Sequence, residues 1–164
     1  MIIREATLSE VPTITDIYNE VLLTTNAIYR ENKVHLADRI NWFNQRVDLG
    51  FPVIVAEANG EVVGYGAFNE FRFGEGYNGT IEHSLHVKST HRGNGVGSAI
   101  LDELIKIAKV QRRKIMVAGI DSENLGSIRF HKKFGFIETA RMPGVAIKHE
   151  KKLTLVLMQK DLAR

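Results

Sequence analysis

The chain has 164 residues, of which 44% are hydrophobic and 25% charged, and its formal net charge is +3. These values predict one globular domain over 1–164 with its own core, and the mild charge favours no nucleic-acid partner. The absence of cysteine excludes disulfides, thiol nucleophiles and thiolate metal sites. The sequence has neither a signal-peptide core nor an apolar run that could cross a membrane, so we expect a cytoplasmic protein.

The first half of the chain mixes strand and helix patterns. A capping residue, Thr7 or Ser9, precedes a helix that carries Pro12 early, where proline is tolerated. Asn59-Gly60 forms the centre of a hairpin turn. The expected elements are a strand over 2–6, the capped helix, a loop over 24–32, a helix over 36–49, strands over 53–57 and 62–68, and a glycine-rich loop over 71–79.

The second half continues the mixture. Gly135 closes a short helix as a C-cap, and Pro143-Gly144 predicts a loop between the last two strands. The expected elements are a strand over 80–87, a helix over 98–109, a strand over 115–120, a helix over 124–134 and strands over 136–142 and 152–159. Hairpins early and crossovers late predict the α+β class around one mixed sheet.

The most informative stretch runs from Leu85 to Leu101. Its first part alternates like a strand, its middle is rich in glycine, and its last part repeats apolar residues at helical spacing. The first amides of a helix have no internal acceptor and lie at the positive end of its dipole. With Arg92 beside them, these amides predict a site for a phosphate or pyrophosphate.

Two nucleotide motifs compete for this loop. A Walker A loop needs Gly-Lys-Ser/Thr where this chain has Gly97-Ser98-Ala99, so we reject it. The glycines Gly93, Gly95 and Gly97 are out of phase with the dinucleotide motif G-x-G-x-x-G, although Asp121 mimics its later acidic residue. An ordinary glycine-rich turn remains the structural alternative.

At these residues the chain resembles the GNAT superfamily of N-acetyltransferases. The run from Arg92 to Gly97 matches that family's pyrophosphate loop for acetyl-coenzyme A. The segments 80–87 and 124–136 resemble the branch that acetylates phosphinothricin and methionine sulfone or sulfoximine. The resemblance implies a single N-acetyltransferase domain with a central, mixed, splayed sheet and about four helices. It also implies acetyl-CoA as donor, a small-molecule amine as acceptor and a homodimer.

The resemblance assigns cofactor contacts to the strand before the loop, the loop itself and the start of the later helix. Asn124 can also cap that helix, and His86 stands where the family would have a tyrosine. The implied cofactor-binding residues are Leu85, His86, Val87, Arg92, Gly93, Asn94, Gly95, Val96, Gly97, Ser98, Asn124 and Ser127.

Glu82 is the expected general base. Strand alternation puts it on one face with Thr80, Ser84 and His86. A carboxylate inside an apolar strand is costly unless it is used or paired, and partial burial would raise its pKa toward neutrality. By resemblance it takes the amine's proton through water; the alternative is a salt bridge to a basic neighbour.

His131 is the second expected catalytic residue. It stands where many family members have the tyrosine that protonates the departing thiolate, and the spacing places Asn124, Ser127 and His131 near one helical face. It could instead only donate a hydrogen bond, or be a solvated surface residue. No histidine pair has metal-ligand spacing with a carboxylate, so no metal site is expected.

The acceptor is the least determined part. Arg72 could clamp a substrate carboxylate or phosphinate, and aromatic residues could form the pocket wall. The expected substrate-binding residues are Tyr29, Arg72, Phe73, Gly74 and Tyr77. A small amino-acid analogue is the first hypothesis. A polyamine, an antibiotic, a protein N-terminus, a non-catalytic acyl-CoA-binding module and a nucleotide-dependent oxidoreductase remain alternatives.

Overall fold

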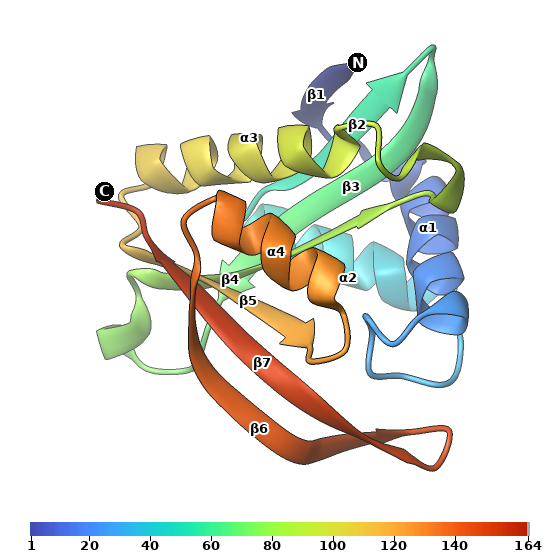
Figure 1. Cartoon of the computed structure of the whole chain (residues 1–164). Helices are drawn as coiled ribbons and strands as arrows, with labels where there is room; N and C mark the ends of the chain where they lie inside the picture. Colours follow the sequence, from blue (N-terminus) through green and yellow to red (C-terminus); the bar gives the residue numbers. More distant parts are fainter. Residues whose placement is uncertain (164) are drawn as a thin grey trace.

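The computed structural model describes residues 1–163 as seven strands in one sheet with four helices on its two faces (Figure 1). The sheet order is β1-β2-β3-β4-β5-β7-β6, and only β4 and β5 run parallel. The strands are β1 (Ile2–Glu5), β2 (Val53–Ala58), β3 (Glu61–Glu70), β4 (Thr80–Val87), β5 (Ile115–Asp121), β6 (Ile137–Lys148) and β7 (Lys151–Asp161). The helices are α1 (Val11–Thr24), α2 (Leu36–Asp48), α3 (Val96–Val110) and α4 (Leu125–Lys133).

The two faces of the sheet carry separate hydrophobic cores. α3 and α4 cover one face, where Ile100, Leu104 and Ile128 pack on strand residues such as Ile81 and Met116. The largest cluster on the other face joins α1 and α2 to β2 and β3. Because α3 lies close to β3, a Cβ on Gly66 would come within 2.5 Å of Ile100, so glycine is required there.

The sheet opens between β4 and β5. These strands pair only at Thr80↔Ile115, Ile81↔Met116 and Glu82↔Val117. Beyond Glu82 they diverge, and the backbone groups of β4 that face β5 lose their partner strand. This fork is the splayed sheet that the sequence predicts, and it leaves main-chain groups free for an extended ligand.

Most predicted elements lie where the sequence places them apart from small shifts of their ends, and three differences bear on the site or the sheet. The first helix begins at Val11 after a separate 3₁₀ turn over Leu8–Glu10. α3 begins at Val96, two residues earlier than predicted. The predicted loop at Pro143-Gly144 is wrong: β6 continues through it, and the irregularity is absorbed as a register shift between Met142 and Ala146. A bulge at a sheet edge accommodates proline without a break.

No helix among residues 1–163 combines the length and apolar character needed to cross a bilayer.

Candidate active site

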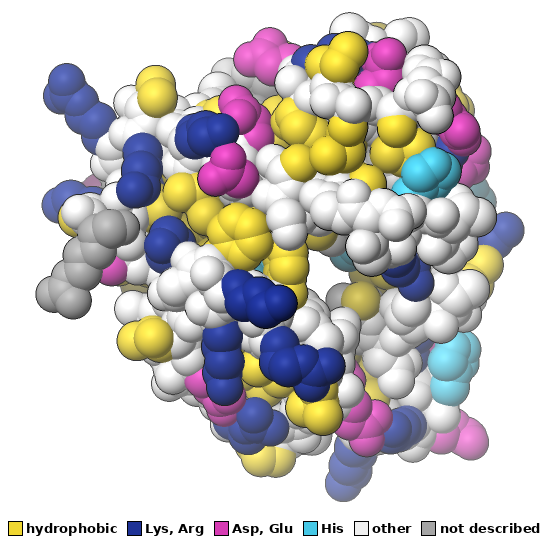
Figure 2. All heavy atoms as spheres, turned by 45° about the horizontal axis from the view of Figure 1, so that its top comes forward, with side chains coloured by type: hydrophobic (Ala, Val, Ile, Leu, Met, Phe, Trp, Pro, Cys, Tyr) yellow, Lys and Arg dark blue, Asp and Glu magenta, His cyan; other side chains and the backbone are white. Residues whose placement is uncertain are grey.

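A groove of about 1000 Å³ follows the end of β4 and the start of α3. Its walls include the predicted residues Leu85, His86, Val87, Arg92, Gly93, Gly95, Gly97, Ser98, Asn124 and Ser127. The space-filling view shows a hollow with Lys and Arg side chains near its rim (Figure 2). Most of the predicted cofactor residues therefore share one surface.

Glycine shapes the rim of this groove. Gly93 and Gly95 have φ of 79° and 80°, a conformation that side chains disfavour, and Gly95 is the N-cap of α3. The first amides of α3 therefore lie bare beside the groove. Arg92 is tied back, because its Nε donates to the carbonyl of Val87 at 3.2 Å.

Two predicted cofactor residues do not line the groove. Asn94 is exposed outside it, and the side chain of Val96 is buried in the core between α3 and the sheet. Only the main chain of Val96 is left to contact a ligand in the groove.

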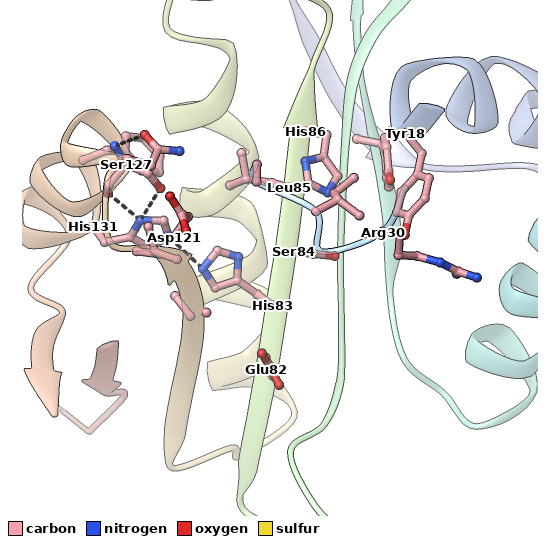
Figure 3. Close-up of a pocket in the computed structure, with 18 of the residues that line it drawn as sticks. Tyr18, Arg30, Glu82, His83, Ser84, Leu85, His86, Asp121, Ser127 and His131 are labelled. Atoms are coloured by element: carbon pink, nitrogen blue, oxygen red, sulfur yellow. Dashed lines mark hydrogen bonds between the residues drawn. The ribbon is translucent and has the colours of Figure 1, made fainter. Parts of the chain in front are cut away.

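A second cavity, of about 500 Å³, reaches through the fork to both faces of the sheet. In Figure 3, β4 runs between Ser127 and His131 on one side and Tyr18 and Arg30 on the other. The groove and the cavity have common walls at Ala27, Leu85, His86, Asp121, Asn124, Ser127 and Phe130. The two spaces are thus contiguous at the fork.

Glu82 lies at the point where the fork opens and lines the cavity. Its carboxylate is partly buried, and among residues 1–163 it has no hydrogen bond and no ion pair, so the salt-bridge alternative finds no partner. Gly119 opposite leaves room for it, because a Cβ there would lie 3.2 Å from Glu82 Oε1. Burial raises the pKa of this carboxyl.

His131 is 5% exposed and is not a solvated surface residue. Its Nδ1 lies 2.8 Å from the carbonyl oxygen of Ser127, and its Nε2 lies 3.1 Å from Nε2 of His83 (Figure 3). A carbonyl only accepts, so Nδ1 of His131 carries the proton and its bare Nε2 accepts from His83. Burial lowers the pKa of His131, and that of His83 to about 3, so both rings are neutral near pH 7.

Asn124 and Ser127 connect α4 to the groove. Asn124 Oδ1 accepts from the backbone N–H of Ser127 at 3.1 Å, which is the predicted helix cap. No hydrogen bond is recorded for its Nδ2 within residues 1–163, so this donor is available to a ligand while the cap is intact.

His86 packs between two tyrosine rings on the face covered by α1 and α2. Its ring centroid lies 6.0 Å from that of Tyr18 and 5.7 Å from that of Tyr65. Burial, reinforced by the charges of Arg39 and Arg92, lowers its pKa to about 4. His86 is a neutral wall residue common to the groove and the cavity.

The predicted substrate residues are not brought to the cavity. The loop of Arg72, Phe73, Gly74 and Tyr77 joins β3 to β4 away from it, and Phe73 is 99% exposed. Tyr29 does not line the cavity either. Its hydroxyl donates to the buried carboxylate of Asp121 at 2.7 Å and so holds that wall residue in place.

Sequence reasoning missed the arginines of the cavity. Arg39 and Arg46 of α2 line it, and Trp42 between them stacks with both guanidinium groups. The available signal was spacing, because 39, 42 and 46 follow the i+3 and i+4 rule of one helix face. Among residues 1–163 no group of three or more histidine and acidic side chains is arranged to hold a metal ion.

A forked sheet, bare amides at a helix start and an unpaired carboxylate at the fork define a class: an acyltransferase that lays an extended thioester along β4. The model of the acetyltransferase (GNAT) family matches residues 14–136, and the chain belongs to this family. It is an acetyl-CoA-dependent N-acetyltransferase, which confirms the predicted enzyme class and donor.

Known proteins are similar over nearly the whole chain. The L-methionine sulfoximine/L-methionine sulfone acetyltransferase of Salmonella typhimurium is 42% identical over 99% of this chain and 95% of its own. The acetyltransferase yncA of Salmonella typhimurium, solved with its cofactor acetyl-CoA, has a TM-score of 0.94 and 42% identity, covering 98% of this chain and 93% of that chain.

A ribosomal-protein-alanine N-acetyltransferase from Brucella melitensis has a TM-score of 0.96 and 39% identity, covering 98% of this chain and 99% of that chain. Phosphinothricin acetyltransferases are more distant relatives. The predicted fold and branch are confirmed.

Proposed function

We propose that this enzyme transfers the acetyl group of acetyl-CoA to the α-amino group of a small amino-acid analogue, of the methionine sulfone, methionine sulfoximine or phosphinothricin type. The observation that carries the proposal is the unpaired carboxylate of Glu82 in a cavity of about 500 Å³ contiguous with the groove beside α3. The names of the methionine sulfoximine and phosphinothricin relatives support the acceptor class.

In this proposal the groove holds the cofactor. The amides from Gly93 to Ser98 receive the pyrophosphate, with Arg92 as a nearby cation. The pantetheine arm extends along the unpaired edge of β4, where it can bond main-chain groups of Leu85 and Val87. Asn124 Nδ2 and the Ser127 hydroxyl face the same groove, so the acetyl group arrives at the fork beside Glu82.

The chemistry is direct transfer. Glu82 accepts a proton from the amine through water, and the free nitrogen attacks the thioester carbonyl. The nitrogen of the tetrahedral intermediate gives its extra proton to solvent, the intermediate collapses to the amide with cleavage of the C–S bond, and the departing thiolate takes up a proton from solvent. We assign His131 to positioning, because both ring nitrogens are already bonded and the ring is neutral. A neutral histidine without a free N–H has no proton for the sulfur.

An acceptor that carries a carboxylate fits the cavity better than a polycation. Arg30, Arg39 and Arg46 outnumber its two carboxylates, Glu82 and Asp121. A polyamine would meet this positive charge, whereas an amino acid would find a partner for its carboxylate. A protein N-terminus is the second candidate, and the Brucella melitensis relative, named for alanine of a ribosomal protein, supports it.

A panel of amines tests the acceptor. Free-thiol release is measured with methionine sulfone, methionine sulfoximine, phosphinothricin, spermidine, an aminoglycoside and a peptide that begins with alanine. We expect kcat/KM for the best amino-acid analogue to exceed that for the other classes at least about tenfold. A preference for spermidine or the peptide, or no thiol release with any of the amino-acid analogues, would refute the proposed acceptor.

We further propose a cytoplasmic homodimer that detoxifies such analogues, since acetyl-CoA is a cytoplasmic donor. β6 is a sheet edge with large apolar residues exposed, including Ile137 at 63% and Ile147 at 64%. Such an edge favours pairing with a second copy. Light scattering should give twice the chain mass, and Ile147→Glu should shift it toward the monomer. A monomeric wild type would refute the dimer.

A further inference from the structure

One face of α2 presents two arginines to the cavity. Arg39 is 7% exposed, and its Cζ lies 3.8 Å from the centre of the Trp42 ring and 4.4 Å from that of Tyr18. The Cζ of Arg46 lies 4.7 Å from the centre of the same Trp42 ring. Stacking of this kind fixes the planes of the guanidinium groups and leaves their N–H edges free to bind.

Neither arginine has an anionic partner among residues 1–163. Arg39 Nη2 donates to the hydroxyl of Tyr65 at 3.2 Å, and Arg46 Nη2 donates to Asn69 Oδ1 at 3.3 Å. The Nε atoms of both are buried without any hydrogen-bond partner. Burial lowers the pKa of Arg46 to about 10, so it stays charged at neutral pH. A buried cation and a partly buried cation that form no ion pair cost folding free energy unless a ligand supplies a partner.

The strand register places the hydrogen-bond acceptor of Arg46 beside Glu82 and that of Arg39 beside His86. Tyr65 pairs with His86 and Asn69 pairs with Glu82 in the β3–β4 ladder. Directly paired residues share a face and lie roughly 5 Å apart at Cα. The side chain that accepts from Arg46 is therefore the cross-strand neighbour of Glu82, and no ion pair joins Arg46 to Glu82. The cavity separates opposite charges that do not neutralise each other.

We propose that Arg39 and Arg46 form the subsite for the carboxylate of the acceptor, so that its α-amino group is presented to Glu82. The inference rests on the proposed function, and it names the residues that would bind the carboxylate of the acceptor. An α-amino acid carries its amine and carboxylate on one carbon, which suits neighbouring groups of opposite charge. The guanidinium edges supply charge-assisted hydrogen bonds to a carboxylate. This subsite differs from the one predicted at Arg72, which lies outside the cavity.

The test compares methionine sulfone with 3-(methylsulfonyl)propylamine, the same molecule without its carboxylate. For Arg46→Met we expect kcat/KM for methionine sulfone to fall about 10- to 100-fold, mainly through KM, as loss of a charge-assisted hydrogen bond implies. The value for the amine should change less than about threefold, and Arg46→Lys should recover part of the loss. Arg113→Met is the matched control, because Arg113 also stacks on an aromatic ring, Phe51, but lies outside the cavity.

Arg39→Met should show the same selective loss. Since Arg39 is deeply buried, the acetyl-CoA affinity and melting temperature of the Arg39→Met variant are measured first. If that variant does not fold, the two Arg46 variants decide whether the subsite exists. Equal losses on both substrates, no loss on either, or a selective loss in Arg72→Met but not in Arg46→Met would overturn the subsite. If the wild type acetylates no amino-acid analogue, the proposed function fails instead, which is a separate result.

Discussion

Replacing Glu82 by glutamine tests the general base with almost no change in side-chain volume. The carboxylate has no hydrogen bond or ion pair within residues 1–163, and Gly119 leaves space beside it, so glutamine disturbs no partner. General base catalysis contributes typically 10²–10⁴-fold to a rate. We therefore expect kcat to fall by about that factor in Glu82→Gln while the affinity for acetyl-CoA stays unchanged.

The same substitution should raise stability near neutral pH. Burial raises the folded-state pKa of Glu82 above its unfolded value. The folded chain then binds more protons than the unfolded chain in that pH window, so the charged carboxylate lowers the free energy of unfolding as pH rises through it. Glutamine removes this cost. The melting temperature of Glu82→Gln should exceed that of the wild type at pH 8, and the difference should shrink in acid.

Three measurements check this reasoning: thiol release under saturating cofactor, its pH profile and thermal melting. The wild-type kcat/KM should fall on the acid side through a pKa above the ordinary value for glutamate. A Glu82→Gln enzyme within about threefold of wild-type kcat would refute the assignment of the base. A lower melting temperature at pH 8 would refute the unpaired, buried state of the carboxylate.

Other substitutions probe the surroundings of this site. Gly119→Ala places a Cβ 3.2 Å from Glu82 Oε1 and should lower kcat about tenfold, whereas Gly76→Ala, with nothing within 4 Å, should leave it unchanged; equal kcat values would contradict this. His131→Gln should lower kcat less than about tenfold and leave the pH profile unaltered, whereas a loss of about 10²-fold or more would identify a proton donor. Lys148→Met should destabilise the chain by about 3 kcal/mol in denaturant unfolding, because its buried ammonium donates to three carbonyls. The exposed Lys106→Met is the control and should change the free energy of unfolding by less than about 0.5 kcal/mol.

The strand, loop and helix around the cofactor groove were predictable because their signals are local. Alternation fixed the face of Glu82, and glycines that adopt positive φ at 93 and 95 mark a turn wherever they occur. The capping role of Asn124 follows from its own neighbours in the same way. Features that depend on a few adjacent residues can be predicted from a single sequence.

The spacing of the α2 arginines puts them on one helix face, but their burial in a cavity was not predictable because it depends on tertiary packing. In the sequence, Arg39 and Arg46 resemble the solvated cations of an amphipathic helix, and only packing against Tyr18 and Tyr65 buries the first. Arg72 was predicted to bind the substrate because it stands in an aromatic loop near Glu82 in the sequence. The structure places that loop away from the cavity. The continuation of β6 past Pro143 likewise depends on pairing with β7.

The unpaired charges that line the cavity have a common explanation. Within residues 1–163 neither Glu82 nor Arg39 nor Arg46 forms an ion pair, although the register of β3 and β4 puts Asn69, which accepts from Arg46, directly across from Glu82. A protein selected for stability alone would join them, since an isolated buried charge is costly. Without an ion pair between them, these side chains are complementary in charge to a molecule that carries an amine beside a carboxylate. In our proposal an acceptor of this kind supplies both missing partners when it binds, so the expected selectivity for amino acids and the free-energy cost of the unpaired charges have the same origin.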